Sequence, residues 1–263
     1  MNPQEAFSRF NFFHSLEVEP GVFTPGVKWA SIYQSAFEES TKEIDFDGKR
    51  VIDIGCRDGA MLFVAEKRGA KELLGVDNDL SPALTEFLIP HFNSKIKTME
   101  RNLYDLGPEE LGKFDIVIAC GLLYHLKYPV YGMKKLSSLL KPGGTLILET
   151  ALFGSLDGFP FIHYCAPEKS PYEKTSVSFP NLSALRNMCD IVGLKDIGIL
   201  KRFNPLKFKT EEFYPGTSGE LTNLETFIID RAIISASKDA EESELDRYFE
   251  QTHTKHRTNG KKI

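Results

Sequence analysis

The sequence has few cysteines and lacks several patterns that mark whole classes of protein. Its four cysteines stand far apart, and no two have the spacing of a metal-binding pair or of a tight disulfide framework. No apolar run approaches the roughly 20 residues that a membrane helix needs. The first residues, MNPQEAFSRFNFFHS, have no signal-peptide pattern. We therefore expect a cytoplasmic protein with reduced thiols, no bound metal and no membrane attachment.

The chain also lacks an excess of positive charge. It has 32 Lys and Arg against 37 Asp and Glu in 263 residues, a formal net charge of -5. A large nucleic-acid footprint is not indicated by this balance, although a local basic patch remains compatible with it. Hydrophobic residues make up 41% and charged residues 26%, which is typical of a globular protein with a substantial core.

Strand and helix patterns alternate through the middle of the chain. The predicted strands are RVIDIG (50–55), ELLGVD (72–77), residues 95–100, FDIVIAC (114–120) and TLILET (145–150). Between them, helices are predicted over residues 59–68, from residue 81 towards 91, and over about 130–140. This alternation predicts an α/β fold of the doubly wound type, a parallel sheet covered on both faces.

The segments around this core have a different texture. Residues 1–47 are rich in phenylalanine and predict a cap segment with one helix at 29–43. Residues 151–180 break the alternation and are rich in Phe, Pro, Gly and Tyr, which favours a lid-like insertion after the fifth strand. A helix at 181–192, a strand at 195–200 and a long strand at 225–238 complete a domain of residues 48–238. Residues 239–263 form a polar tail.

The loop after the first predicted strand reads Asp53-Ile54-Gly55-Cys56-Arg57-Asp58-Gly59. Glycines here let the backbone approach a ligand, and the helix start that follows offers unpaired N–H groups. A dinucleotide loop would read G-x-G-x-x-G, but Arg57 stands where the middle glycine belongs. Asp53 precedes the first glycine by two positions. The pattern suits a ligand with an ammonium group and no pyrophosphate, such as S-adenosylmethionine (SAM).

Polar residues near the ends of the next two strands could bind an adenosine. Asp77 can accept hydrogen bonds from both hydroxyls of a ribose, and Asn78 beside it could reach the adenine. Either Asn102 or Asp105 could accept from the adenine amino group. Each could instead cap a loop, and an aspartate at position 77 would suit NAD as well as SAM.

The segment GLLYHL (121–126) follows the fourth strand, where ligands bind in open α/β sheets. Tyr124 and His125 are therefore the candidate catalytic residues, with His125 as a general base that titrates near neutral pH. Glu149, at the end of the fifth strand, is a weaker candidate. His14 and His163 could contact the substrate or lie on the surface.

Together, VIDIGCRDG, GVD, FDIVIACGLLYHL and LKPGGTLILET resemble the class I SAM-dependent methyltransferases. More narrowly, GLLYHLKYP with LILET, and FHSLEVEPG ahead of them, resemble the family that contains the tRNA wobble-uridine methyl- and carboxymethyltransferases. The resemblance runs over about residues 12–200. It implies a seven-stranded Rossmann-like sheet whose last strand is antiparallel, and SAM as cofactor.

The resemblance also implies a set of cofactor contacts. They fall on Asp53, Gly55, Gly59, Asp77, Asn102 and the backbone of Cys120 and Gly121. In the tRNA carboxymethyl enzymes a tyrosine of the YH motif and a lysine of a K-W pair contact the cofactor, which implies Tyr124 and Lys28 here. Those enzymes carry a basic residue before that pair for the extra carboxylate of carboxy-SAM. Between Phe10 and Val27 this chain has no Lys or Arg, which favours ordinary SAM.

Three functions are compatible with these patterns. The first is methyl transfer to an oxygen or nitrogen of a small molecule, such as a sugar, a natural product or another metabolite; the aromatic insertion suits an enclosed pocket. The second is tRNA modification at the wobble uridine, which requires a basic surface near the pocket. FNPLKFKT (203–210), with Lys201 and Arg202 before it, could begin such a surface. The third is a non-catalytic binding protein, if Arg57 blocks SAM.

Overall fold

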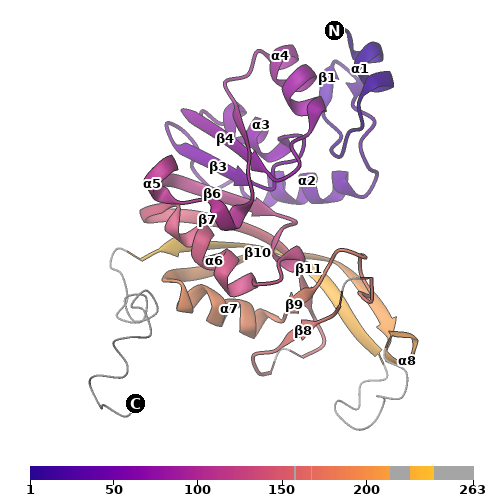
Figure 1. Cartoon of the computed structure of the whole chain (residues 1–263), viewed down its shortest axis with the longest axis vertical. Coiled ribbons are helices and arrows are strands. Elements are labelled where there is room, and N and C mark those ends of the chain that lie inside the picture. The colour runs from indigo at the N-terminus through magenta and orange to yellow at the C-terminus, as the bar shows by residue number, and fades with distance from the viewer. Residues whose placement is uncertain (157, 167, 214–225, 240–263) are drawn as a thin grey trace.

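A seven-stranded sheet organises the part of the chain that the computed structural model describes, residues 1–156, 158–166, 168–213 and 226–239 (Figure 1). The strand order is β10-β11-β7-β6-β3-β4-β5. The strands are β3 (Arg50–Ile54), β4 (Glu72–Asp77), β5 (Lys97–Glu100), β6 (Phe114–Cys120), β7 (Leu140–Phe153), β10 (Leu194–Lys209) and β11 (Thr226–Lys238). Strands β7, β6, β3, β4 and β5 pair in parallel, and β11 is antiparallel to both of its neighbours. The predicted α/β fold and its antiparallel last strand are confirmed.

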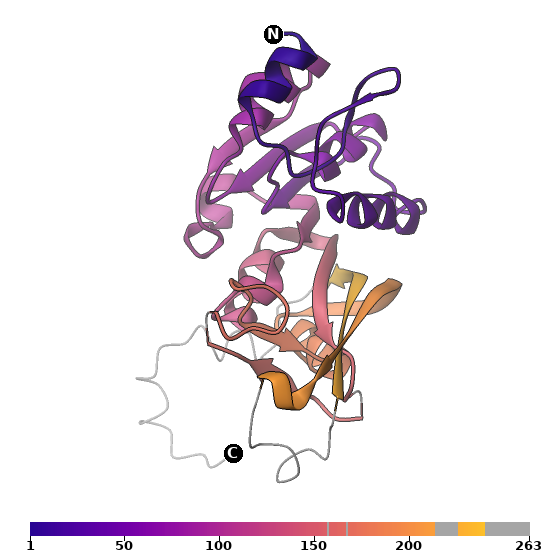
Figure 2. The same ribbon diagram turned by 90° about the vertical axis from the view of Figure 1, so that its right-hand side faces the viewer.

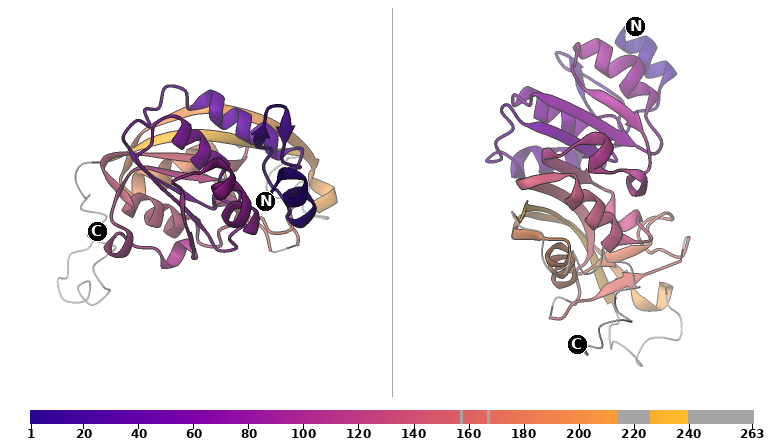
Figure 3. Two further views of the ribbon diagram at one scale, coloured as in Figure 1. Left: turned by 90° about the horizontal axis from the view of Figure 1, so that it is seen from above. Right: turned by 60° about the vertical axis from the view of Figure 1, so that its left-hand side comes forward.

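Helices cover both faces of the sheet (Figure 3). The helices that follow the N-terminal segment are α3 (Ala60–Lys67), the π-helical η1 (Ala83–Leu88), α4 (Ile89–Phe92), α5 (Pro108–Leu111), α6 (Pro129–Ser138), α7 (Leu182–Ile191) and, at the end of β10, α8 (Thr210–Phe213), with single turns η2 (Leu103–Asp105) and η3 (Leu123–His125). Side chains alternate along each strand, so Ile116 and Ile118 face one core while Val117 faces the other. This alternation produces two hydrophobic layers from one sheet.

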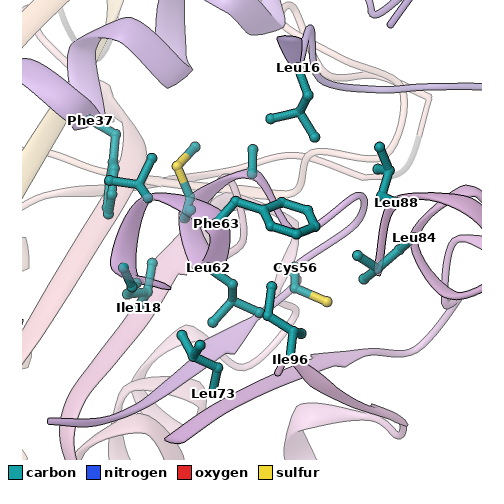
Figure 4. Close-up of a cluster of buried hydrophobic side chains, with 14 of the residues drawn as sticks. Leu16, Phe37, Cys56, Leu62, Phe63, Leu73, Leu84, Leu88, Ile96 and Ile118 are labelled. Atoms are coloured by element: carbon teal, nitrogen blue, oxygen red, sulfur yellow. The ribbon is translucent and has the colours of Figure 1, made fainter. Parts of the chain in front are cut away.

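One of these layers surrounds α3 (Figure 4). Leu62 and Phe63 of α3 lie in a cluster with Phe37 from the N-terminal segment and Leu84 from η1. The backbone at Gly59, where α3 begins, has φ +74°, and a Cβ there would lie 2.9 Å from Leu84. Gly59 is therefore required by the turn into the helix and by its close packing on η1.

The N-terminal segment packs over one end of the sheet (Figure 2). It contains α1 (Pro3–Arg9), the β1 (Glu17–Glu19) and β2 (Val22–Phe23) hairpin, and α2 (Ala30–Ser40), which is shorter than predicted. The rings of Phe7 and Phe12 meet Phe87 of η1 edge to face, at 6.4 and 6.1 Å. The backbone N–H groups of Phe13 and His14 both donate to Asp58. The segment is thus joined to the loop that follows β3.

The region after β7 is more ordered than the sequence indicates. Strand β7 continues to Phe153 because β11 pairs with it that far, and β8 (Ile162–Tyr164) pairs with β9 (Ser178–Pro180). The N–H of Val177 donates to the Tyr124 carbonyl at 2.9 Å, and the Ser178 hydroxyl donates to the Leu126 carbonyl at 3.1 Å. The insertion is therefore attached to η3, although its role as a lid stays a prediction.

Strand β10 is longer than predicted and includes FNPLKF. Pro205 is tolerated because β10 is the edge strand of the sheet. Lys201 pairs with Glu39, and Arg202 with Asp230 at 2.5 Å. The basic surface expected to begin here is thus partly neutralised. Most of the predicted polar tail, residues 240–263, lies outside the described residues.

Within the described ranges, no helix is both long enough and apolar enough to cross a membrane. The same residues contain no group of three His, Cys, Asp or Glu side chains placed to hold a metal ion.

Asn181 is a stability determinant that can be tested. Its Oδ1 accepts from the N–H groups of Ala184 at 2.8 Å and Phe161 at 3.1 Å, and its amide donates to the Phe159 carbonyl at 2.6 Å. It caps α7 and holds the insertion while fully buried. Asn181→Ala should lower the free energy of unfolding by about 2–4 kcal/mol, because a cap and several buried partners are lost together.

Urea denaturation measures this effect, and Asn2→Ala is the matched control. Asn2 caps α1 through one exposed hydrogen bond to the N–H of Glu5, so its loss should cost about 0.5–1 kcal/mol. Equal costs for the two variants would contradict the role assigned to Asn181.

Candidate functional site

A cavity of about 850 Å³ opens at the carboxyl ends of the parallel strands. It lies where the strand order reverses, with β4 and β5 on one side of β3 and β6 and β7 on the other. Phe13, His14, Trp29 and Tyr33 of the N-terminal segment line one part of it, and Glu173 of the insertion lines another. The volume is within the range for an organic ligand or cofactor.

Most of the residues that the sequence predicted for the site line this cavity. They are Asp53, Gly55, Asp77, Asn78, Asn102, Cys120, Gly121, Tyr124 and His125. Lys28 and Gly59 do not line it. Lys28 precedes the lining residue Trp29, and Gly59 forms the start of α3 as described above.

Asp53 is a buried carboxyl group that faces the cavity. Burial, together with the nearby charge of Asp77, raises its pKa to about 8. Neither a hydrogen bond nor an ion pair to the described residues offsets this burial. A cation in the cavity would stabilise the ionised form, so this position fits the ammonium group of SAM.

Asp77 shapes the loops on either side of the cavity. Its two oxygens accept from the N–H groups of Arg57 at 2.9 Å and Asp79 at 3.0 Å. Each carboxylate oxygen can accept more than one hydrogen bond, so the group can still receive ribose hydroxyls. Arg57 has φ +46°, and its side chain lies 3.4 Å from Asp79 and over the Phe13 ring. It is 44% exposed, so it lies at the mouth and leaves the cavity open.

Two predicted adenine and backbone contacts have structural partners of their own. Asn102 caps η2, because its Oδ1 accepts from the N–H of Tyr104 at 3.0 Å. The N–H of Gly121 donates to two oxygens of Glu149, the backbone carbonyl and Oε2, each at 3.0 Å. Asp105, the alternative to Asn102, does not line the cavity.

Arg231 is a site residue that sequence reasoning missed. It lies on β11, is 1% exposed, and binds Glu149 of β7 through Nε and a terminal nitrogen, both at 2.5 Å. Its other terminal nitrogen donates to the Tyr172 hydroxyl at 2.8 Å, and its guanidinium lies 4.7 Å from the Tyr124 ring. Glu149, proposed above as a weaker base, is therefore occupied by structural partners. An arginine within the apolar run FIIDRAII was the available signal, because such a charge must be paired.

His125 lies beside two groups of the insertion. Its Nδ1 is 3.2 Å from the Thr175 carbonyl, which can accept but not donate, so Nδ1 carries the hydrogen in neutral histidine. Nε2 lies 3.5 Å from the Glu173 carboxylate. Burial lowers the pKa of His125, while the Thr175 carbonyl and Glu173 oppose this shift. In this tautomer Nε2 of His125 and the Glu173 carboxylate oxygen are both hydrogen-bond acceptors. A hydroxyl or N–H of the molecule to be methylated could donate a hydrogen bond to them.

The two other histidines have different positions. His14 lines the cavity; burial lowers its pKa to about 4, and its Nδ1 has no hydrogen-bond partner among the described residues. His163 lies outside the cavity and stacks on Phe153 at 5.5 Å. A contact of His163 with the substrate, one of the two alternatives left open by the sequence, stays a prediction.

Residues 27–198 match the family described as a methyltransferase domain. The chain is 32% identical over 207 residues to a tRNA U34 carboxymethyltransferase of Helicobacter acinonychis, with 76% of this chain and 75% of the relative covered. A protein of the same description from Campylobacter hominis is 35% identical over 163 residues, 60% of this chain and 54% of the relative. The N-terminal domain of EvdMO1, solved with SAH and D-fucose, is 17% identical with a TM-score of 0.61, covering 90% of this chain and 95% of that one.

The fold, the cavity at the strand ends and the family match define a SAM-dependent methyltransferase. The chain belongs to the methyltransferase-domain family, with SAM as its cofactor. The resemblance expected from the motifs is confirmed, and the non-catalytic alternative is not supported.

The raised pKa of Asp53 predicts that binding of the cofactor releases a proton from this carboxyl group. With a pKa of about 8 the free carboxyl is mostly protonated at pH 7, and an ammonium group beside it favours the ionised form. Affinity for the demethylated cofactor should therefore increase from pH 6 to 8 and level off above 8. Calorimetry in phosphate and in Tris at pH 7 should give different heats, because the released proton is taken up by the buffer.

Asp53→Asn is the control for this linkage. It should weaken binding and remove the difference between the two buffers. Equal heats for the wild-type protein in both buffers would contradict the ionisation assigned to Asp53.

The Glu149–Arg231 pair predicts a large effect on stability. Arg231→Met should lower the free energy of unfolding by about 3–5 kcal/mol, because Glu149 is left buried without its counterion. The double variant Glu149→Leu with Arg231→Met should recover much of this loss. Arg9→Met, which breaks the exposed Arg9–Glu86 pair, should cost less than about 1 kcal/mol. Urea denaturation would contradict the assignment if the two single arginine variants lost equal stability.

Proposed function

We propose that the protein is a tRNA-modifying methyltransferase whose acceptor is the wobble uridine. The observation that carries the proposal is the 32% identity to a tRNA U34 carboxymethyltransferase over three quarters of both chains. The loop after β3 and the Tyr124–His125 pair line the same cavity. We further propose that the transferred group is a methyl and not a carboxymethyl group. Arg231 already binds Glu149, so its charge is neutralised within the protein. Residues 11–26 contain no Lys or Arg that could hold the extra carboxylate of a carboxymethyl donor.

In this proposal the residues of the cavity divide into two groups. Asp53 binds the ammonium group of the cofactor and Asp77 the ribose, with Asn78, Asn102 and the Cys120–Gly121 backbone near the adenosine. Bound SAM supplies a methyl group that its positive sulfur already activates. Tyr124 and His125 lie towards the insertion, where the acceptor binds. The chain supplies alignment of the acceptor and a place for its proton.

His125 is the proposed general base. The Thr175 carbonyl holds the tautomer that leaves Nε2 unprotonated. With SAM bound, its methyl–sulfur bond would break as the acceptor oxygen attacks the methyl carbon, the thioether would be the leaving group, and Nε2 of His125 would take the hydroxyl proton. The resulting imidazolium faces Glu173, 3.5 Å away, which stabilises it until the proton passes to solvent. Lys28, next to the lining residue Trp29, stays a proposed contact near the cofactor.

A small-molecule acceptor is the second candidate. The net charge of -5 and the ion pairs of Lys201 and Arg202 favour it over a large RNA footprint. The hydroxyl of Tyr33, which lines the cavity, also lies 3.4 Å from the hydroxyl of Tyr172 in the insertion, so the two segments meet beside the site.

The decisive experiment uses tRNA from cells in which this gene is deleted. The purified protein and SAM are added, the tRNA is digested, and the nucleosides are analysed by mass spectrometry. A uridine derivative heavier by one methylene group and located at position 34 is expected. Its absence, with cofactor binding intact, would contradict the tRNA proposal and favour the small-molecule candidate.

His125→Asn should bind the demethylated cofactor normally but methylate about 10²–10⁴ times more slowly, because the base is lost. The wild-type rate should decline as pH falls through the pKa of His125, which lies below its usual value of 6.5. Glu173→Gln should retain more activity and move this decline to lower pH, because Glu173 raises the pKa of His125. Full activity and an unchanged pH profile for His125→Asn would make the catalytic assignment wrong.

A further inference from the structure

Three tyrosines form a continuous aromatic surface from the mouth of the cavity outwards. Tyr104 lies in η2, Tyr128 precedes α6, and Tyr131 lies in the first turn of α6. Tyr128 is 67% exposed and Tyr131 is 50% exposed. The ring of Tyr104 stacks on Tyr131 at 5.5 Å and lies 6.1 Å from Tyr128. Tyr104 and Tyr128 line the cavity, whereas Tyr131 lies outside it.

This tyrosine surface is held in place by the backbone. The Tyr104 hydroxyl accepts from the N–H of Tyr128 at 3.2 Å and lies 3.4 Å from the Tyr128 carbonyl. Helix α6 buries another face, which contains Met133 and Leu136, so the exposed rings are not required by its packing on the sheet. Grouped exposed aromatic rings at the mouth of a cavity indicate a binding surface more strongly than single exposed residues do.

Lysines accompany these rings. Lys127 lines the cavity, and Lys135 lies 5.7 Å above the Tyr131 ring while it donates to the Leu106 carbonyl. Acidic side chains of the same region are Asp105 in η2, Glu109 and Glu110 in α5, and Asp77, Asp79 and Glu173 of the cavity lining; Glu110 is paired with Arg101 at 2.8 Å. Aromatic faces between cationic side chains suit bases that stack and phosphates that need positive charge.

We propose that Tyr104, Tyr128 and Tyr131, with Lys127 and Lys135, bind unpaired nucleotides that flank the base being modified. This inference rests on the proposed tRNA function, and it assigns the surface on which the RNA beside the modified base would lie. Tyr128 and His125 line the same cavity, so the Tyr128 ring is available to a nucleotide adjacent to the acceptor. Stacking on the tyrosines requires bases that are not paired, which selects a single-stranded loop over a duplex.

The test compares ring removal with ring retention. Tyr128→Ala and Tyr131→Ala should each raise the KM for tRNA about tenfold, because one base loses its stacking partner. The kcat at saturating tRNA and the affinity for the demethylated cofactor should stay within twofold of wild type. Tyr128→Phe and Tyr131→Phe keep the ring and should keep the wild-type KM. Phe23→Ala, which removes a 52% exposed ring from the β1–β2 hairpin, is the control.

The outcomes separate this inference from the function on which it rests. If wild-type protein methylates tRNA and the alanine variants keep the wild-type KM for tRNA, the role of the tyrosine surface in RNA binding is contradicted and the tRNA function stands. If wild-type protein neither binds nor methylates tRNA, both are wrong. If Tyr131→Ala converts a dimer into a monomer in sedimentation without changing the KM for tRNA, the surface joins two copies of the chain and the RNA inference is overturned.

Discussion

The ion pair between Glu149 and Arg231 is the interaction on which the floor of the site depends. The pair joins β7 to the antiparallel strand β11. Arg231 lies opposite Ala151 in the register of the two strands, so its side chain reaches two residues along β7 to Glu149. Glu149 also accepts from Gly121, and Arg231 donates to Tyr172 of the insertion. Removing two charges from water costs several kcal/mol per ion, which close bidentate contact and further hydrogen bonds must offset. The positions of β6, β7, β11 and the insertion are therefore coupled through one pair.

Two buried carboxyl groups in the same cavity consequently have different roles. Glu149 has its counterion within the protein, so it supports the site without a ligand. Asp53 has none among the described residues, and its raised pKa reflects that lack. A buried carboxyl group of this kind disfavours its own ionised form until a cation arrives. The difference separates a carboxylate that supports the structure from one available to a cofactor, and sequence position does not show it.

The strands and the loops at their carboxyl ends were predictable because their signals are local. Periodicity located β3, β4 and β6, and parallel pairing brings Asp53, Asp77 and the Tyr124–His125 motif to one edge. The pairing of Arg231 with Glu149 was not predictable, since it depends on the register between strands 82 residues apart in sequence. The carboxyl end of β7 lies three residues beyond its predicted position for the same reason, because β11 pairs with it as far as Phe153. A glycine needed for helix packing and one needed for close approach look alike in a sequence, so the contact of Gly59 with the cofactor stays a prediction.

The parts of the cavity wall that the sheet does not supply determine which acceptor can bind. The N-terminal segment contributes Phe13 and Trp29, the insertion contributes Glu173 and Thr175, and Tyr33 meets Tyr172 where the two come together. Strand ends hold the cofactor in much the same way in any sheet of this topology, so a similar fold at 17% identity carries no information on the acceptor. In the proposed mechanism His125 receives the acceptor's proton, and both the carbonyl beside its Nδ1 and the carboxylate beside its Nε2 belong to the insertion. Under that proposal catalysis and acceptor choice depend on the same segment, because a change in the insertion would alter the surroundings of the base and the pocket together.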